Sequence, residues 1–195
     1  MKERIKTIQR TLGVSADGII GPMTLSALEG ALGIVPATMA QVMPTQAEVR
    51  SGKSIFGAPG DAQLVRIALP YPLFYEGKQL STISVHRSIA DRVTAALKEV
   101  LAVYGAEKIH ALGLDQYGGC YNYRKTTSGS TLSMHAWGIA LDFCPVGNEY
   151  ATHAPKATLS RAECAKWWEI WEKHGATSMG RARDFDWMHL QFARL

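Results

Sequence analysis

Two runs of regularly spaced apolar residues open the chain and predict a short helical start. Apolar side chains recur every three or four positions at Ile5, Ile8 and Leu12, and again at Leu25, Leu28 and Leu32. This spacing places each run on one face of a helix. Asp17-Gly18 predicts a tight turn between the runs, and Pro22 suits the first turn of the second helix. We therefore expect residues 1–33 to form a small helical module.

Proline and glycine are frequent between this module and the rest of the chain. Residues 34–62 contain Pro36, Pro44, Gly52, Gly57, Pro59 and Gly60. Such a composition is typical of a connector. We predict a linker over residues 34–53 and a second domain over residues 54–195.

Short apolar segments in the second domain predict strands. Residues 64–69 and 80–85 are rich in Leu, Ile and Val, and residues 137–144 and 186–192 are two further apolar segments of strand length. These four segments are interspersed with helical patterns but show no βαβ rhythm. The fold class is therefore predicted as α+β, with a small antiparallel sheet and flanking helices.

Two longer segments of this domain show helical spacing. One helix is expected over residues 89–104, with Gly105 as its end. Another is expected from Ser160 to Gly175, with Ser160 and Glu163 as a capping box. The second helix carries Trp167, Trp168 and Trp171. Such a group is more typical of a hydrophobic core than of a surface that stacks on sugars.

The composition excludes some classes of partner. Hydrophobic residues make up 47% of the chain, which is ordinary for a globular protein. The net charge of +4 suits an anionic partner such as nucleic acid, lipid headgroups or a cell wall. Lys and Arg form no basic stripe interleaved with aromatics, so we do not expect nucleic-acid binding. No apolar run approaches the roughly 20 residues that span a bilayer, so membrane insertion is not expected either. The start, MKERIKTIQRTLG, lacks the apolar segment of a signal peptide.

The cysteines predict neither a disulfide framework nor a cysteine zinc cluster. There are three, Cys120, Cys144 and Cys164, and none forms a C-x-x-C pair. We expect them to be buried among apolar side chains, with a Cys120–Cys144 bridge as the alternative.

Two segments combine residues that can bind a metal ion. In LSMHAWGIALDF, His135 precedes Asp142 by seven residues, and in DFDWMHLQF, Asp186 precedes His189 by three. Residues seven apart in a regular strand face opposite sides, so a turn or bulge near Gly138 is needed to bring His135 and Asp142 together. Two imidazoles and a carboxylate suit Zn²⁺ with an open fourth position, and Asp186 could then act as a general base.

Spacing alone leaves other interpretations open. A histidine in a half-buried strand is usually a core or surface residue, and an aspartate after an apolar run often caps a turn. The other histidines, His86, His110, His153 and His174, fit no metal-binding pattern and are interpreted as structural or surface residues.

A family resemblance favours the metal interpretation. Ser133-x-His135-x-x-Gly138-x-Ala140-x-Asp142, followed by Asp186-x-x-His189, resembles the signature of the M15 metallopeptidases over about residues 54–195. That family includes D-alanyl-D-alanine carboxypeptidases and dipeptidases and phage L-alanyl-D-glutamate endopeptidases. It shares its metal-site fold with the hedgehog signalling domain. Asp rather than Glu at position 186 is more similar to the phage endopeptidases.

The resemblance implies roles for individual residues. His135, Asp142 and His189 would bind one Zn²⁺ per chain, and Asp186 would be the general base. Arg124 matches the family's arginine that polarises the scissile carbonyl, and its planar fork suits an oxyanion or a substrate carboxylate. Ser133 is expected either to bind substrate or to orient its loop.

The N-terminal segment carries a second resemblance. IKTIQRTLGVSADGIIGPMTLSAL, residues 5–28, is similar to the repeat of peptidoglycan-binding domains, although it is shorter than the usual three-helix domain. The resemblance implies bacterial peptidoglycan as the partner. A helical hairpin without a binding role is the alternative.

Three functions follow as hypotheses. The first is an endolysin-like, monomeric endopeptidase that cuts the L-Ala–D-Glu bond of the stem peptide, waiting in the cytoplasm until a holin opens the membrane. The second is a D-Ala-D-Ala carboxypeptidase. The third is a catalytically silent wall-binding protein, against which the presence of Asp186 argues.

Overall fold

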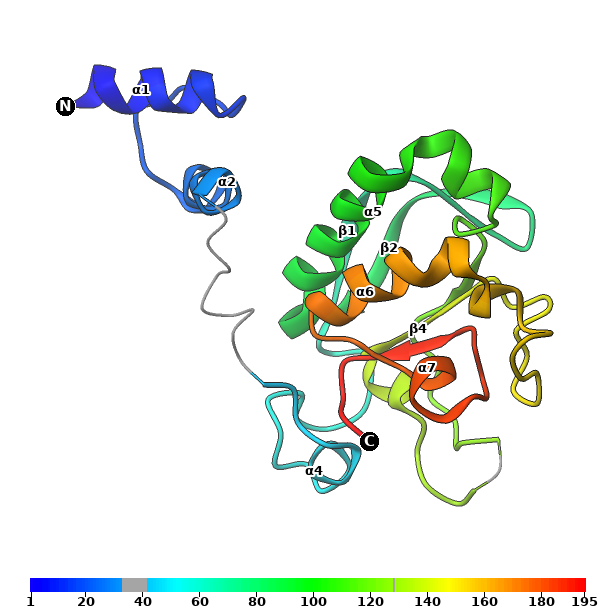
Figure 1. Ribbon diagram of the computed structural model, residues 1–195. Helices are drawn as coiled ribbons and strands as arrows, with labels where there is room; N and C mark the ends of the chain where they lie inside the picture. The colour runs from blue at the N-terminus through cyan, green and yellow to red at the C-terminus, as the bar shows by residue number, and fades with distance from the viewer. Residues whose placement is uncertain (33–41, 128) are drawn as a thin grey trace. The chain divides into compact units, whose positions relative to one another are not determined.

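The chain folds into two compact units. The computed structural model describes residues 1–32, 42–127 and 129–195 (Figure 1). The units are Met1–Val42 and Met43–Leu195. Of the linker expected over residues 34–53, residues 34–41 lie outside the described residues. Residues 43–53 belong to the second unit.

One buried glutamine holds the first unit together. The helices α1 (Lys2–Thr11) and α2 (Pro22–Leu32) are joined by a turn, as the apolar spacing predicts. Gln9 is 1% exposed, and its amide nitrogen donates to Asp17 Oδ1, the Ile19 carbonyl and Thr24 Oγ1 at 2.8–2.9 Å. Its amide oxygen accepts from the Gly18 backbone N–H. These hydrogen bonds explain why the turn carries this Asp-Gly pair and why α2 has a threonine at position 24.

The second unit contains a long hairpin packed against a helix. The strands β1 (Leu64–Tyr75) and β2 (Lys78–His86) pair antiparallel, and α5 (Ala90–Ala111) packs against β1 (Figure 1). The two strands were expected, but both are longer than their apolar segments. Gly105 interrupts the helix as expected: its φ of 71° and ψ of 157° are not helical. A second helical stretch follows this kink, so α5 as a whole extends to Ala111.

A small antiparallel sheet forms the other part of the second unit. Its strands have the order β3-β4-β6-β5, with bounds β3 (Tyr117–Gly119), β4 (Ala140–Phe143), β5 (Thr177–Ser178) and β6 (His189–Gln191). The shorter elements are α4 (Gln46–Arg50), α7 (Met179–Arg183), and 3-10 turns at Arg87–Ile89, Met134–Trp137, Thr158–Ser160 and Ala162–Cys164. The α+β class with a small antiparallel sheet is confirmed.

A tryptophan helix covers one face of this sheet. Trp167, Trp168 and Trp171 on α6 (Ala165–Lys173) are at most 1% exposed, which places them in the core as expected. The ring of Phe143 on β4 lies 5.4 Å from Trp167 and 5.5 Å from Trp171. Because side chains alternate along a strand, Phe143 faces α6 while its neighbour Asp142 faces the other way. The sheet therefore has an apolar face and a face that is free to carry polar groups.

The predicted capping box of α6 is wrong. The helix begins at Ala165 after Cys164, and no side chain caps its N-terminus. Ser160 ends one 3-10 turn and Glu163 lies within the next. The Ser160 hydroxyl donates to the carbonyl of Ala157, three residues earlier in the chain, and therefore does not cap the helix that follows.

Gly138 is the backbone hinge that leads from the turn Met134–Trp137 into β4. Its φ is 65°, a left-handed conformation, and an added Cβ would lie 2.4 Å from Leu64 Cδ2. Its carbonyl accepts from the backbone N–H of His86, which ties the hinge to the end of β2. The turn near Gly138 that the spacing of His135 and Asp142 required is therefore present.

We predict that Gly138→Ala lowers the free energy of unfolding and weakens metal binding together. The backbone conformation alone costs an L-residue about 1–2 kcal/mol, and displacing Leu64 adds to this. Gly77→Ala is the matched control, since Gly77 has a φ of 75° and nothing within 4 Å of an added Cβ. Chemical denaturation and zinc titration of both variants measure the difference. Equal metal affinity in the two would contradict the role of the hinge.

Candidate metal centre

Strand pairing brings two of the predicted ligands together. Asp142 on β4 lies directly opposite His189 on β6. His135 comes from the 3-10 turn Met134–Trp137 and reaches the same place because the chain reverses at Gly138. All three residues are buried, with exposures of 3% for His135 and 8% for each of the others.

The three side chains converge at hydrogen-bond distances. His135 Nε2 lies 3.3 Å from Asp142 Oδ2, and His189 Nδ1 lies 3.1 Å from Asp142 Oδ1. The two imidazole nitrogens, His135 Nε2 and His189 Nδ1, are 3.2 Å apart. One ligand atom from each residue lies within 4.8 Å of the others, a grouping that could hold a metal ion. Two imidazoles and one carboxylate fit the donor set of a zinc site with an open fourth position.

The tautomer of His135 is set by the backbone. Its Nδ1 lies 2.6 Å from the carbonyl oxygen of Cys120, which can only accept. Nδ1 therefore carries the proton, and the lone pair of Nε2 points into the cluster. Cys120 itself is free and buried, as are Cys144 and Cys164, so no disulfide links Cys120 to Cys144.

A glutamine sets the tautomer of His189. The Gln191 amide nitrogen donates to the Ala193 carbonyl at 2.7 Å, and Gln191 Oε1 accepts from Gln46 Nε2 at 3.1 Å. These two bonds fix which end of the amide is oxygen. Gln191 Oε1 lies 3.3 Å from His189 Nε2, so that nitrogen donates and leaves the lone pair of Nδ1 for a metal ion. Such outer partners orient the ligands of metal sites.

The cluster favours an ionised carboxylate. Burial alone would raise the pKa of Asp142, but without a metal ion the imidazoles of His135 and His189, once protonated, donate to its oxygens and hold its pKa well below its usual value. Burial lowers the pKa of His189, but the hydrogen bond to Asp142 more than offsets this and raises it. The ionised carboxylate is the form that binds a cation, so the lowered pKa of Asp142 suits a metal ligand, whereas a metal ion would have to displace the proton that the raised pKa of His189 favours.

Asp186 lies next to the cluster in an unusual environment. Its backbone is left-handed, with a φ of 51°, and its carbonyl accepts from the backbone N–H of His189. Among the described residues no group donates to its buried Oδ1 atom. Burial raises the pKa of Asp186, and the charge of Asp142 raises it further. A buried carboxylate oxygen without a donor is suited to accept a proton from a substrate or a water molecule.

Arg124 and Ser133 line the same cleft. The positive charge of Arg124 lowers the pKa of Asp186, while Arg124 Nη1 donates to the Lys125 carbonyl at 3.3 Å. Ser133 is the N-cap of the turn that carries His135, and its hydroxyl accepts from the His135 backbone N–H. Ser133 therefore orients the loop, and binding of substrate by Ser133 stays a prediction.

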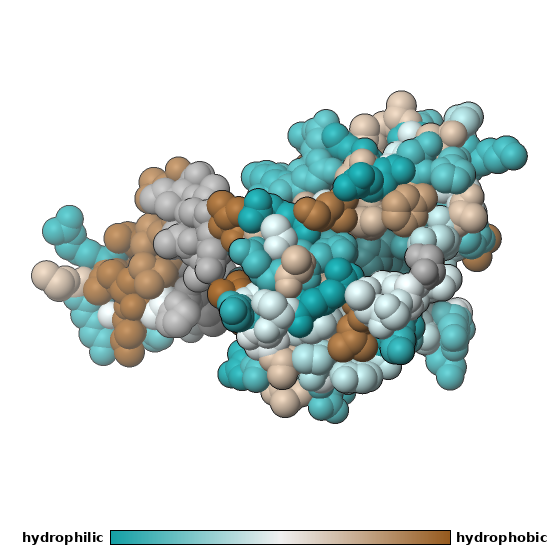
Figure 2. Space-filling view, turned by 90° about the horizontal axis from the view of Figure 1, so that it is seen from below, coloured by the Kyte–Doolittle hydropathy of each residue, from teal (hydrophilic) through white to brown (hydrophobic). Residues whose placement is uncertain are grey.

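The cleft beside the cluster has a volume of about 180 Å³. Its lining contains residues that the sequence did not indicate: Gln46, Arg50, Thr126, Thr127, Met134, Tyr150, Met179, Phe185 and Gln191. On the face of the second unit seen from the side of α4, hydrophilic residues predominate and hydrophobic ones are scattered (Figure 2). Gln46 and Arg50 lie on α4, inside the expected linker. The capping box of Thr45 and Glu48 is the sequence signal that could have found this helix.

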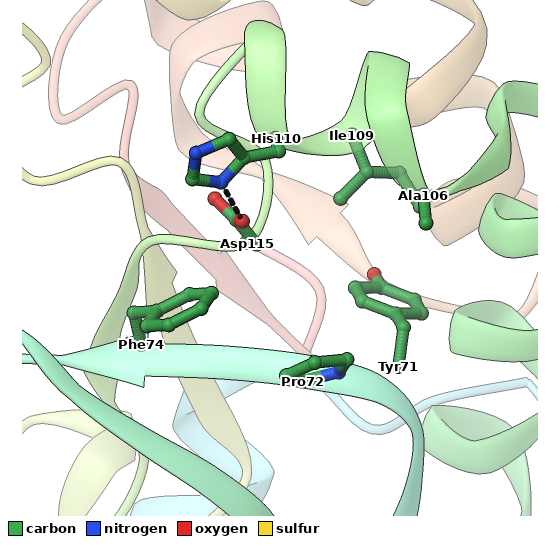
Figure 3. Close-up of a pocket in the computed structure, with 7 residues that line it drawn as sticks. All are labelled: Tyr71, Pro72, Phe74, Ala106, Ile109, His110 and Asp115. Carbon is green, nitrogen blue, oxygen red and sulfur yellow. Dashed lines mark hydrogen bonds and ion pairs between the residues drawn. The ribbon is translucent and has the colours of Figure 1, made fainter.

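A second hollow lies between β1 and the end of α5 and shares no lining residue with the metal cleft (Figure 3). Its walls are mainly apolar, and His110 Nδ1 lies 2.6 Å from Asp115 Oδ2 at one side. In the described part of the chain, only His135, Asp142 and His189 form a group that could hold a metal ion. His86, His110, His153 and His174 lie elsewhere, as expected.

Comparison with known families bears on the same segment. Residues 126–192 match a family of M15 peptidases described as D-alanyl-D-alanine carboxypeptidase. The matched span contains Ser133, His135, Asp142, Asp186 and His189, while Arg124 lies just before it. No curated protein and no solved structure gives a significant match to the chain. The family match supports a peptidase of the M15 family, and the buried His-Asp-His group within the matched span could bind its metal ion.

Proposed function

We propose that this protein is a zinc-dependent peptidase that cuts the L-Ala–D-Glu bond in the stem peptide of bacterial peptidoglycan. The observation that carries the proposal is the convergence of His135, Asp142 and His189 beside Asp186, whose Oδ1 lacks a donor among the described residues. When bound, Zn²⁺ acts as a Lewis acid that makes a water molecule more acidic and polarises a carbonyl group. One zinc ion per chain is expected.

Asp186 and Arg124 carry out the other steps of the proposed reaction. Asp186 accepts a proton from the attacking water as the oxygen of that water bonds to the scissile carbonyl carbon. Arg124 donates hydrogen bonds to the carbonyl oxygen as negative charge develops there. When the C–N bond breaks, Asp186 passes the proton to the leaving amine. The new carboxylic acid gives its proton to the released amine, so the products are a carboxylate and an ammonium group, and Asp186 returns to its ionised form.

Two bonds of the stem peptide are candidates, and two features of the chain favour the L-Ala–D-Glu bond. The matched family is described as D-alanyl-D-alanine carboxypeptidase, so release of terminal D-alanine is the second candidate function. Aspartate at position 186 and the N-terminal unit favour the endopeptidase. Mass spectrometry of fragments from purified peptidoglycan decides between them. New amino groups on D-glutamate support the endopeptidase, and free D-alanine supports the carboxypeptidase. Bound zinc without any new amino group would indicate a silent wall-binding protein.

The first unit supports a peptidoglycan partner through its motif. Gln9 binds the turn that contains Asp17-Gly18, so the motif residues form one hydrogen-bonded structure. Several large apolar side chains of the unit are exposed: Ile8, Ile19, Ile20, Leu25 and Leu32.

In the described residues no helix has the length and apolar character of a membrane span. A wall-binding unit would hold the enzyme on its insoluble substrate, which the enzyme would reach after holin-type release.

We predict that the purified protein binds one zinc ion per chain and that a chelator removes both the metal and the activity. His135→Ala and His189→Ala should each lose tight binding, because two remaining ligands make a poor zinc site. His153→Ala is the control, since that side chain is 60% exposed and lies outside the cluster. Elemental analysis and calorimetric titration measure the metal. Stoichiometric zinc in the double variant of His135 and His189 would rule the site out.

We predict that Asp186→Asn keeps zinc and fold but lowers kcat by at least about 10²-fold, the scale of a general base. Asparagine tolerates the left-handed backbone, so the change removes the charge without adding strain. Asp184→Asn is a matched control. Asp184 also has a positive φ, of 52°, but its Oδ1 accepts from the Ala154 backbone and from Trp187 Nε1. If Asp186→Asn instead releases the metal, Asp186 is a ligand and not the base.

We predict that deletion of residues 1–42 weakens pelleting with intact peptidoglycan but spares cleavage of a soluble stem peptide. A tethered binding unit raises the local substrate concentration without adding contacts at the metal centre. The truncation keeps α4, which belongs to the second unit. If the first unit is a structural hairpin, deletion lowers the melting temperature and reduces both activities together. Undiminished pelleting would remove the wall-binding role alone.

A further inference from the structure

Arg50 is a half-buried cation that lines the cleft of the metal centre. Its Nε donates to the Leu132 carbonyl and its Nη1 donates to Gln46 Oε1, each at 3.1 Å. Both acceptors are neutral. Within residues 1–32, 42–127 and 129–195, no carboxylate lies within ion-pair distance of Arg50.

An unpaired guanidinium in this position favours an anionic ligand. Burial lowers the pKa of Arg50, so its surroundings disfavour the positive charge. Charges withdrawn from water are normally paired. A guanidinium has five N–H groups, and the two bonds to Leu132 and Gln46 leave the rest, mainly on the Nη side, without a protein acceptor. Two parallel N–H groups on that side match the two oxygens of a carboxylate.

The helix that carries Arg50 holds it in place before any ligand binds. Thr45 and Glu48 form a capping box at the start of α4. The backbone of Gln46 donates to the Arg194 carbonyl at 2.8 Å, and Val49 is fully buried. The guanidinium is therefore fixed by its own helix and by Leu132, and little side-chain entropy remains to be lost on binding.

Arg50 and Arg124 occupy different places in the cleft. The positive charge of Arg124 lowers the pKa of Asp186, and the proposed mechanism assigns Arg124 to the scissile carbonyl. Arg50 instead connects through Gln46 and Gln191 to the far nitrogen of His189 by successive hydrogen bonds of 3.1, 3.1 and 3.3 Å. Two arginines thus line one cleft, and the proposed mechanism uses only Arg124 at the reacting carbonyl.

We propose that Arg50 determines specificity by binding a free carboxylate of the substrate close to the scissile bond. This inference rests on the proposed peptidase function and narrows its substrate class to stem peptides that carry an ionised carboxylate in that position. A peptide with the same carboxylate converted to an amide loses the bidentate pairing and is a poor substrate.

The test uses two soluble stem peptides that differ only in this group, a carboxylate in one and a primary amide in the other. With the zinc-loaded protein, Arg50→Gln should raise KM for the carboxylate peptide by roughly 10- to 100-fold, the scale of hydrogen bonds to a charged group, and leave kcat nearly unchanged. For the amide peptide the same variant should change KM by less than about twofold. Arg124→Lys, in contrast, should lower kcat for both peptides.

Arg66→Gln is the matched control. It removes one positive charge from an exposed position on β1, outside the cleft, and should change neither KM. A loss of zinc or of melting temperature in Arg50→Gln, with equal effects on both peptides, would show that Arg50 only supports the fold. That result would overturn the proposal.

A binding measurement separates this inference from the peptidase function. Chelator-treated protein cannot turn over, but Arg50 remains in place, so calorimetry can compare the affinities of the two peptides directly. Tighter binding of the carboxylate peptide by the wild-type protein, lost in Arg50→Gln, supports the role of Arg50 even if the zinc-loaded protein cleaves neither peptide. If the wild-type protein binds both peptides with equal affinity, the role of Arg50 is overturned. This comparison uses the wild-type protein alone, so it does not depend on whether a variant folds.

Discussion

Asp142 on β4 lies directly opposite His189 on β6, and the rest of the site is arranged around this cross-strand pair. The pairing works because the two short strands present unlike faces. Phe143 packs on the tryptophans of α6, while Asp142 on the other face meets two imidazoles. A shift of one residue in the register would turn Asp142 toward the apolar helix, where a carboxylate is costly to bury. The hydrophobic core therefore fixes the geometry of the metal centre through the register of β4 and β6.

The period of a strand also explains the outer hydrogen bonds of the centre. Gln191 follows His189 by two residues and so lies on the same face of β6. From there its amide holds His189 and accepts from Gln46 on α4. The segment that looks like a connector in the sequence thus helps to hold a candidate metal ligand. α4 belongs to the second unit, which begins at Met43.

The sequence predicted the local chemistry better than the long-range contacts. Spacing alone left other interpretations of His135, Asp142 and His189 open, but their resemblance to the M15 signature made them recognisable, and the structure brings them together. The α+β class was also predictable from apolar segments that alternate without a βαβ rhythm. The contribution of α4 was not, since Gln46 and Gln191 are far apart in the chain and each glutamine alone is an ordinary polar residue. The start of α6 was also missed, because Ser160 lies in a separate 3-10 turn and its hydroxyl bonds to Ala157, a competition between local turns that propensity does not describe.

Asp184 and Asp186 share a strained backbone conformation but differ in what surrounds their carboxylates. Both have left-handed backbones, a conformation that costs an L-residue about 1–2 kcal/mol. The carboxylate of Asp184 offsets this cost by accepting from Ala154 and Trp187, so its role within the fold is complete. Asp186 gains no such compensation at Oδ1, and burial without a donor adds a further cost of about 1–3 kcal/mol. Costs of this kind persist where the surrounding structure holds a residue in place, and they cluster at functional sites. Among the described residues that line the cleft, Asp186 is the carboxylate whose Oδ1 has no donor, and a free acceptor is the property that the proposed general base requires.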